Sequence, residues 1–243
     1  MAWLPTERRA HLDALAIGIL LVCCAIWGLQ QSLIKATLDV VPPLLQASFR
    51  FAGATLLLLV WCRWRGIALW QRDGSAWGGV LAGLLFAGEF VFVYNGMHLS
   101  SASRITVFLY TAPFWVALLL PRFMPAERLN RRQWWGLTLA FFSVALAFSE
   151  GLTRVSGAHD MLWLGDAMGL IAGMMWGLTT LTIRLTRLGQ ASAEKVLFYQ
   201  VAAATLVLPL LSLLRGEAWT LGYPVWVWSS LWFQAGVGAF ATF

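Results

Sequence analysis

The sequence predicts an all-α fold, a polytopic membrane helical bundle made of two inverted five-helix repeats with the second repeat incomplete. The first observation behind this prediction is the composition, because 60% of the 243 residues are hydrophobic and only 12% are charged. Soluble domains carry about 25% charged residues. Since so few polar groups cannot cover a globule in water, we expect a lipid bilayer to surround the protein.

The second observation is a stretch that occurs twice. The Trp-Gly pair at residues 27–28 recurs at residues 176–177, and in each copy a cation follows the tryptophan by eight residues. The match continues without a gap through the next hydrophobic segment, where Phe49 corresponds to Phe198. An internally duplicated hydrophobic unit is typical of transporters.

The lengths of the apolar runs predict the number of spans. A helix crosses a bilayer with about 20 apolar residues. By this rule eight segments are expected to span the membrane: residues 14–34, 44–64, 77–99, 105–124, 133–151, 162–183, 195–214 and 225–243. The links between them are short, so we expect no separate soluble domain.

Residues that start or stop helices bound these segments. The first run reaches full spanning length with no small-residue cleavage site after it, which favours a span over a signal peptide. Pro42 precedes the second span and Gly74 the third. Pro113 lies within the fourth and is expected to bend it, either as a hinge or as a static kink. The later boundaries are marked by Pro125, by Gly165 and Asp166, and by Pro224.

Lys and Arg are distributed unequally between the two sides of the predicted bundle. Twelve of the 17 fall on the side of the N-terminus, four fall on the other side, and Arg50 lies inside a span. Basic residues accumulate in the cytoplasm, so we expect the N-terminus on the cytoplasmic side of an inner membrane. Because five spans is an odd number, the second copy of the unit must be inverted.

The repeats are expected at residues 1–152 and 153–243. The second would lack the counterparts of the fourth and fifth spans, which favours a fragment of a ten-span protein over a naturally shortened one.

With these features the chain resembles the EamA-type family of the drug/metabolite transporter superfamily. The resemblance rests on residues 27–28 with Lys35, 176–177 with Arg184, 102–104 with 111–113, 127–129 followed by 133–136, and 165–166. It implies a ten-helix secondary transporter with both termini in the cytoplasm and a central cavity between the repeats. It also implies a cargo of small organic solutes such as amino acids, metabolites or drugs, often moved outward.

Glu89 is the first candidate for chemistry. It lies roughly 15 Å from the end of its span, near the middle of a hydrocarbon core about 30 Å thick. An acidic residue there costs about 2.5 kcal/mol or more. Two interpretations are open: a carboxylate that carries a proton or binds a substrate cation, and a structural acid that is ion-paired or permanently protonated.

Arg50 is expected roughly 9 Å deep in its span, close enough for its side chain to reach Glu89. We expect the two to pair in one state, with substrate or a proton competing for the bond; the alternative is an arginine that extends to the outer interface. Trp27 and Trp176 either line the cavity at equivalent positions or pack in the core. Polar residues inside spans contact substrate or tie helices together; they are Tyr94, Asn95, Tyr110, Tyr199 and Gln200.

No enzyme, cofactor or metal signature occurs in the sequence, and no Walker A pattern is present. The net charge of +6 is spread over the links, so nucleic acid is not an expected partner. We therefore expect a non-enzymatic secondary transporter, an exporter working by alternating access with proton coupling through Glu89. The alternatives are a membrane scaffold or receptor and a membrane-embedded enzyme. The sequence leaves the solute, the coupling ion, the direction of net flux and the oligomeric state open.

Overall fold

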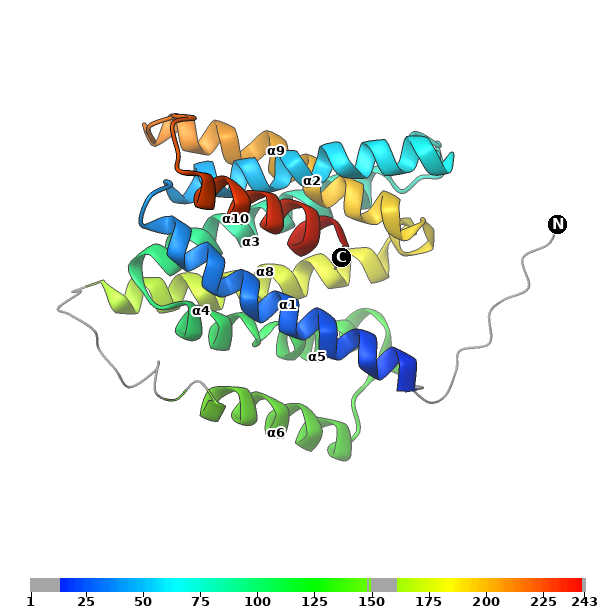
Figure 1. The fold of residues 1–243 in the computed structure, drawn as a ribbon. Coiled ribbons are helices and arrows are strands. Elements are labelled where there is room, and N and C mark those ends of the chain that lie inside the picture. The colour runs from blue at the N-terminus through cyan, green and yellow to red at the C-terminus, as the bar shows by residue number, and fades with distance from the viewer. Residues whose placement is uncertain (1–13, 148, 150–160, 242–243) are drawn as a thin grey trace.

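A computed structural model describes residues 14–147, 149 and 161–241 of the chain (Figure 1). Within these ranges the secondary structure is helical and contains no strand. The elements are α1 (Ala14–Leu38), α2 (Pro43–Arg65), α3 (Ala76–Leu99), α4 (Ala102–Leu109), α5 (Ala112–Phe123), η1 (Pro125–Glu127), α6 (Arg131–Ala147), α8 (Leu162–Leu185), η2 (Arg187–Gln190), α9 (Ala193–Leu214), α10 (Val225–Ala235) and the π-helical η3 (Gly236–Ala241).

Six segments of the described chain are long and apolar enough to cross a membrane: Ile17–Leu38, Pro43–Arg65, Ala76–Leu99, Ala102–Phe123, Leu162–Leu185 and Ala193–Leu214. The predicted all-α polytopic bundle is therefore confirmed. Two of the eight predicted spans correspond to shorter helices. The α6 helix has 17 residues, and most of its predicted continuation lies outside the described residues. The α10 helix has 11 residues, because the backbone widens into the π-helical turns of η3.

The helices lie in layers (Figure 1). The α2, α9 and α10 helices lie on one side and α4, α5 and α6 on the other, with α1, α3 and α8 between them. The most extensive packing is that of α3 against α8 and α9, followed by α2 against α9 and by α4 and α5 against α8.

A row of glycines on α8 explains how closely its neighbours approach. Glycines at every fourth position, Gly165, Gly169, Gly173 and Gly177, lie on one face of the helix. A Cβ at Gly173 would lie 2.7 Å from the Phe108 carbonyl oxygen. Small residues at such spacing let helix backbones meet in a membrane. The row therefore positions α4 and α5 directly against α8.

The predicted fourth span is divided into α4 and α5. Helix α4 ends at Leu109 and α5 begins at Ala112, with Pro113 in its first turn. Pro113 has no N–H, so the preceding turn loses a hydrogen-bond donor. The hydroxyl of Thr111 donates to the Phe108 carbonyl at 2.7 Å, and the backbone N–H of Thr111 donates to the same carbonyl at 3.1 Å, which closes a tight turn at the end of α4. The span is therefore broken where the sequence predicts a bend, and whether it moves as a hinge stays a prediction.

Charged contacts connect the links at each end of the bundle. At the end formed by links 66–75, 124–130 and 186–192, which we call the Asp73 end, Lys195 Nζ lies 2.8 Å from Asp73 Oδ2. At the opposite end, formed by links 39–42, 100–101 and 215–224 and called the Glu217 end, Arg104 forms an ion pair with Asp166. The amine of Lys35 donates to the carbonyls of Met97 and Ser100, where α3 ends at this end of the bundle.

Candidate functional site

A cavity of about 420 Å³ lies in the middle of the bundle, with walls from α1, α2, α3, α4, α8 and α9. Its size falls within the range of small-molecule sites. Aromatic and polar side chains both line it; the aromatic ones are Trp27, Phe86, Phe90, Tyr110 and Trp176, and the polar ones include Gln30, Gln31, Arg50, Glu89, Thr106, Thr179, Thr180 and Gln200. We call it the central cavity.

The carboxylate of Glu89 lies in this cavity, and not all of its hydrogen-bond acceptors have a partner. Its side chain is on α3 and the residue is only 5% exposed. Its Oε2 atom has no hydrogen-bond partner among the described residues, and Oε1 of Gln31, which lines the same cavity from α1, is also without one. Buried polar atoms are nearly always hydrogen-bonded, so two unpartnered acceptors in one cavity need an explanation. A proton or a donor group of a bound solute would satisfy them.

Arg50, on α2, is fully buried and its guanidinium is held by the protein. The amide oxygen of Gln30 accepts hydrogen bonds from Nη1 at 3.2 Å and Nη2 at 3.0 Å, in the orientation that lets its nitrogen donate to the Gly238 carbonyl. The rings of Phe51 and Phe90 each lie 5.0 Å from the guanidinium carbon, which adds cation–π attraction. Arg50 is therefore a fixed positive charge in the wall of the cavity rather than a side chain extended to an interface.

Arg50 and Glu89 line the same cavity. No ion pair within 4.0 Å joins them in the part of the chain that the structure describes. The carboxylate is thus free to accept another partner in this conformation. Pairing of the two residues in a different state stays a prediction.

The two tryptophans of the duplicated stretch both reach the central cavity, Trp27 from α1 and Trp176 from α8. Both side chains are partly buried. The ring of Tyr110 lies 6.5 Å from that of Trp176, centroid to centroid, at an interplanar angle of 50°. This aromatic surface can contact the apolar body of a solute.

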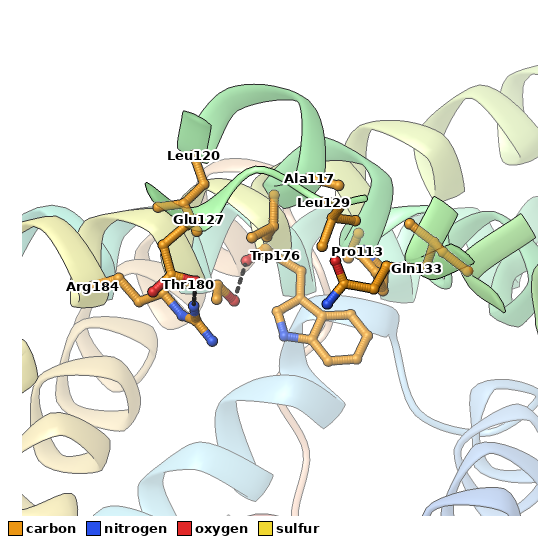
Figure 2. A pocket seen from close by; sticks show the side chains of 12 residues that line it. Pro113, Ala117, Leu120, Glu127, Leu129, Gln133, Trp176, Thr180 and Arg184 are labelled. Carbon is orange, nitrogen blue, oxygen red and sulfur yellow. Dashed lines mark hydrogen bonds and ion pairs between the residues drawn. The ribbon is translucent and has the colours of Figure 1, made fainter. Parts of the chain in front are cut away.

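A second cavity of about 550 Å³ lies between α5, α6 and α8 at the Asp73 end, and we call it the side pocket (Figure 2). Its walls are mostly apolar, from Pro113, Val116, Ala117, Leu120, Leu129 and Leu137. An ion pair, Arg184 Nη1 to Glu127 Oε2 at 3.8 Å, lies at one edge of it, and both side chains are about half exposed (Figure 2). Trp176 and Thr180 line both cavities.

Comparison with known proteins identifies the kind of molecule that has this architecture. The sequence model of the EamA-like transporter family matches residues 14–149, more than half of the chain. The chain belongs to this family. The predicted resemblance is therefore confirmed, and the protein is a multi-pass membrane protein of a transporter family, which implies a lipid bilayer around it and a small solute as cargo.

Two similar proteins agree with this assignment. An uncharacterized transporter of Archaeoglobus fulgidus is 26% identical over 204 residues, which cover 82% of this chain and 68% of that protein. A crystal structure with 19% sequence identity matches with a TM-score of 0.68 over 93% of this chain and 77% of that chain. At that identity the crystal structure supports the fold alone.

The other sequence-predicted residues of this EamA-like transporter are divided between the cavity and the surrounding packing. Tyr110 and Gln200 line the central cavity. Tyr94 is fully buried beside it, where its hydroxyl lies 3.5 Å from Arg50 Nη1. Asn95 donates to a carbonyl of its own helix and accepts from an arginine at the Glu217 end. The ring of Tyr199 packs on Gly79, where a Cβ would lie 2.4 Å from a ring carbon.

Among the polar residues of the central cavity that were not predicted from the sequence, four follow the repeated tryptophans by about one helical turn. They are Gln30, Gln31, Thr179 and Thr180, at the third and fourth positions after the two repeated tryptophans. Residues three and four apart share one face of a helix. The signal was therefore present in the duplicated stretch, because any residue three or four positions after a cavity-lining tryptophan faces the same cavity.

Proposed function

We propose that this protein is a secondary transporter that carries small organic solutes, such as amino acids, metabolites or drugs, by alternating access. It works as an exporter in an inner membrane with its N-terminus in the cytoplasm. The observation that carries the proposal is the unpartnered Glu89 carboxylate in an aromatic cavity deep inside the bundle. A solute with an apolar body and at least one hydrogen-bond donor fits such a site.

Proton coupling follows from the same carboxylate. Glu89 lies in the cavity wall without an ion pair to the fixed charge of Arg50. A proton and a solute donor would therefore occupy the same oxygen in turn. Alternation between these two partners couples solute movement to a proton gradient. The sequence has no Walker A pattern, which favours a gradient as the energy source.

Counterflow in proteoliposomes tests the proposal. Full-length chain is reconstituted with an unlabelled panel of amino acids, amines and dyes inside, and uptake of trace labelled solute is measured between pH 6 and pH 8. We expect uptake for at least one solute, a changed pH profile in Glu89→Gln, and reduced uptake in Arg50→Gln. The exchange of the two charges serves as a third variant, and Glu194→Gln, outside both cavities, is the matched control.

Normal uptake in all three variants at every pH would remove both residues from the mechanism. The same assay separates the alternative functions. A scaffold or receptor gives no counterflow with any solute, and an enzyme returns a covalently altered product.

A further inference from the structure

One row of side chains on α8 runs from the central cavity into the side pocket. Trp176, Thr180 and Arg184 are spaced four residues apart, so they lie on one face of the helix. The first two line both cavities, and Arg184 lies further along in the side pocket beside Glu127 (Figure 2). The two cavities are therefore neighbours that share a wall made of Trp176 and Thr180.

The side pocket connects this shared wall with the surface. The side chains of Glu127 and Arg184 are 40% and 50% exposed at the Asp73 end, whereas Glu89 in the central cavity is 5% exposed. Between the Glu127–Arg184 pair and the central cavity, the wall that α5 contributes is apolar. It is made of small or branched side chains, including Ala112, Val116 and Ala117. Exposure thus decreases from the charged mouth, through an apolar section, to the buried carboxylate.

We propose that the side pocket is the entrance of the permeation path from the Asp73 end, and that the Glu127–Arg184 pair sets its charge preference. This inference rests on the proposed function, because it takes the central cavity as the solute site. With both charges present the Glu127–Arg184 pair itself adds no net charge to the mouth of the pocket. Removal of one charge leaves the other without its ion-pair partner beside the path. Trp176 and Thr180 form the inner limit of the entrance.

The test measures access to the central cavity directly, with charged thiol reagents as probes. The reporter is Thr106→Cys, which lies in the central cavity at 9% exposure, in a chain whose three native cysteines are replaced by alanine. The detergent-solubilised full chain is treated with a cationic trimethylammonium-ethyl or an anionic sulfonatoethyl methanethiosulfonate. The ratio of the two labelling rates reports the charge preference of the path.

Glu127→Gln is expected to raise the anion-to-cation ratio about fivefold, and Arg184→Gln to lower it by a similar factor, because one unit charge about 8 Å away in water changes each labelling rate roughly twofold and in opposite directions for the two reagents. Arg187→Gln and Glu194→Gln are matched controls at the same end but outside both cavities, and they should leave the ratio unchanged. Denatured protein gives the intrinsic reactivity of the cysteine in each variant.

A second pair of variants tests the path by bulk instead of charge. Ala117→Trp fills the side pocket and should slow both reagents, whereas Leu118→Trp, on the 57% exposed side of the same helix, should slow neither. The inference is overturned if the two charge variants do not shift the ratio in opposite directions, if Ala117→Trp behaves like Leu118→Trp, or if the reporter is not labelled in the folded protein. Because labelling does not depend on transport, failure of counterflow alone would leave the entrance in place and remove only the proposed function.

Discussion

The carboxylate of Glu217 caps helix α2 by accepting hydrogen bonds from the main-chain N–H of Leu45 at 2.8 Å and of Leu44 at 3.1 Å. Helix α2 begins after Pro42 with no side-chain cap from its own sequence. The first N–H groups of a helix have no partner within it, and negative charge is favourable there. A residue from the link between α9 and α10 therefore completes the start of α2.

Removal of this cap should destabilise the bundle. We expect Glu217→Ala to lower the free energy of unfolding by about 1–2 kcal/mol, the usual cost of deleting a helix N-cap. Glu217→Gln, which keeps one acceptor but loses the charge, should cost less. Thermal unfolding in detergent measures both, and an unchanged Tm in Glu217→Ala would show that water replaces the carboxylate.

The Asp73–Lys195 contact predicts a pH dependence of stability. The hydrogen bond from the Lys195 ammonium, helped by the backbone N–H of Ser75, holds the pKa of the Asp73 carboxyl well below its usual range. A lowered pKa in the folded state means that the contribution to stability is fully present above the unfolded value near 3.9. It is lost as the pH falls through the lowered value in the folded protein. Asp73→Asn should therefore lower Tm by the same amount from pH 8 to pH 5, and the difference should shrink below about pH 4.

A double variant provides the control for this contact. Lys195 is only 3% exposed, so Asp73→Asn alone leaves a buried ammonium with the Gln71 carbonyl as its acceptor. Lys195→Met in the same chain removes that charge and should restore part of the lost Tm. A single Asp73→Asn variant with wild-type Tm at pH 7 would contradict the assignment.

The two glycines of the duplicated stretch should respond differently to the same substitution. A Cβ at Gly177 would lie 2.8 Å from Trp115 Cβ and 3.0 Å from the Ala112 carbonyl oxygen, whereas one at Gly28 would meet nothing within 4 Å. We expect Gly177→Ala to cost about 1–3 kcal/mol through overpacking. Gly28→Ala should leave stability unchanged or raise it slightly, since alanine is the better helix former. Equal effects of Gly177→Ala and Gly28→Ala on Tm would contradict the close packing of α5 against α8.

Arg50 should not tolerate replacement by lysine. A lysine keeps the charge but cannot donate from two nitrogens in one plane to Gln30, and it has no flat face for the rings of Phe51 and Phe90. A buried polar group left without its partner costs about 1–3 kcal/mol. Arg50→Lys is therefore expected to lower stability in thermal unfolding by an amount in that range. A wild-type Tm would show that a positive charge alone, without the planar pair of guanidinium nitrogens, is enough at this position.

The sequence predicted what depends on composition and local pattern. Apolar runs of spanning length predicted the order of the helices, and the missing N–H of Pro113 predicted a bend where the chain breaks into α4 and α5. The cost of an acidic group among apolar residues singled out Glu89, and the repeated Trp-Gly pair led to two walls of its cavity.

The remainder depends on contacts between distant residues, which no local pattern records. Glu217 caps a helix 172 residues earlier in the chain. The partners of Arg50 include a carbonyl in a π-helical turn, and an α-helical reading of the last segment could not place it there. The side pocket went unnoticed because most of its lining is apolar and looks like ordinary core in a sequence.

The shared wall of the two cavities has a mechanical consequence. Side chains four residues apart on α8 are separated by about 6 Å along the helix axis, so the row from Trp176 to Arg184 is carried by little more than two turns of one rigid rod. A rotation of α8 therefore cannot move Arg184 at the open end of the side pocket without also moving Trp176 and Thr180 in the shared wall. In the proposed transport cycle, opening of the side pocket and reshaping of the central cavity would therefore be a single event that one helix controls.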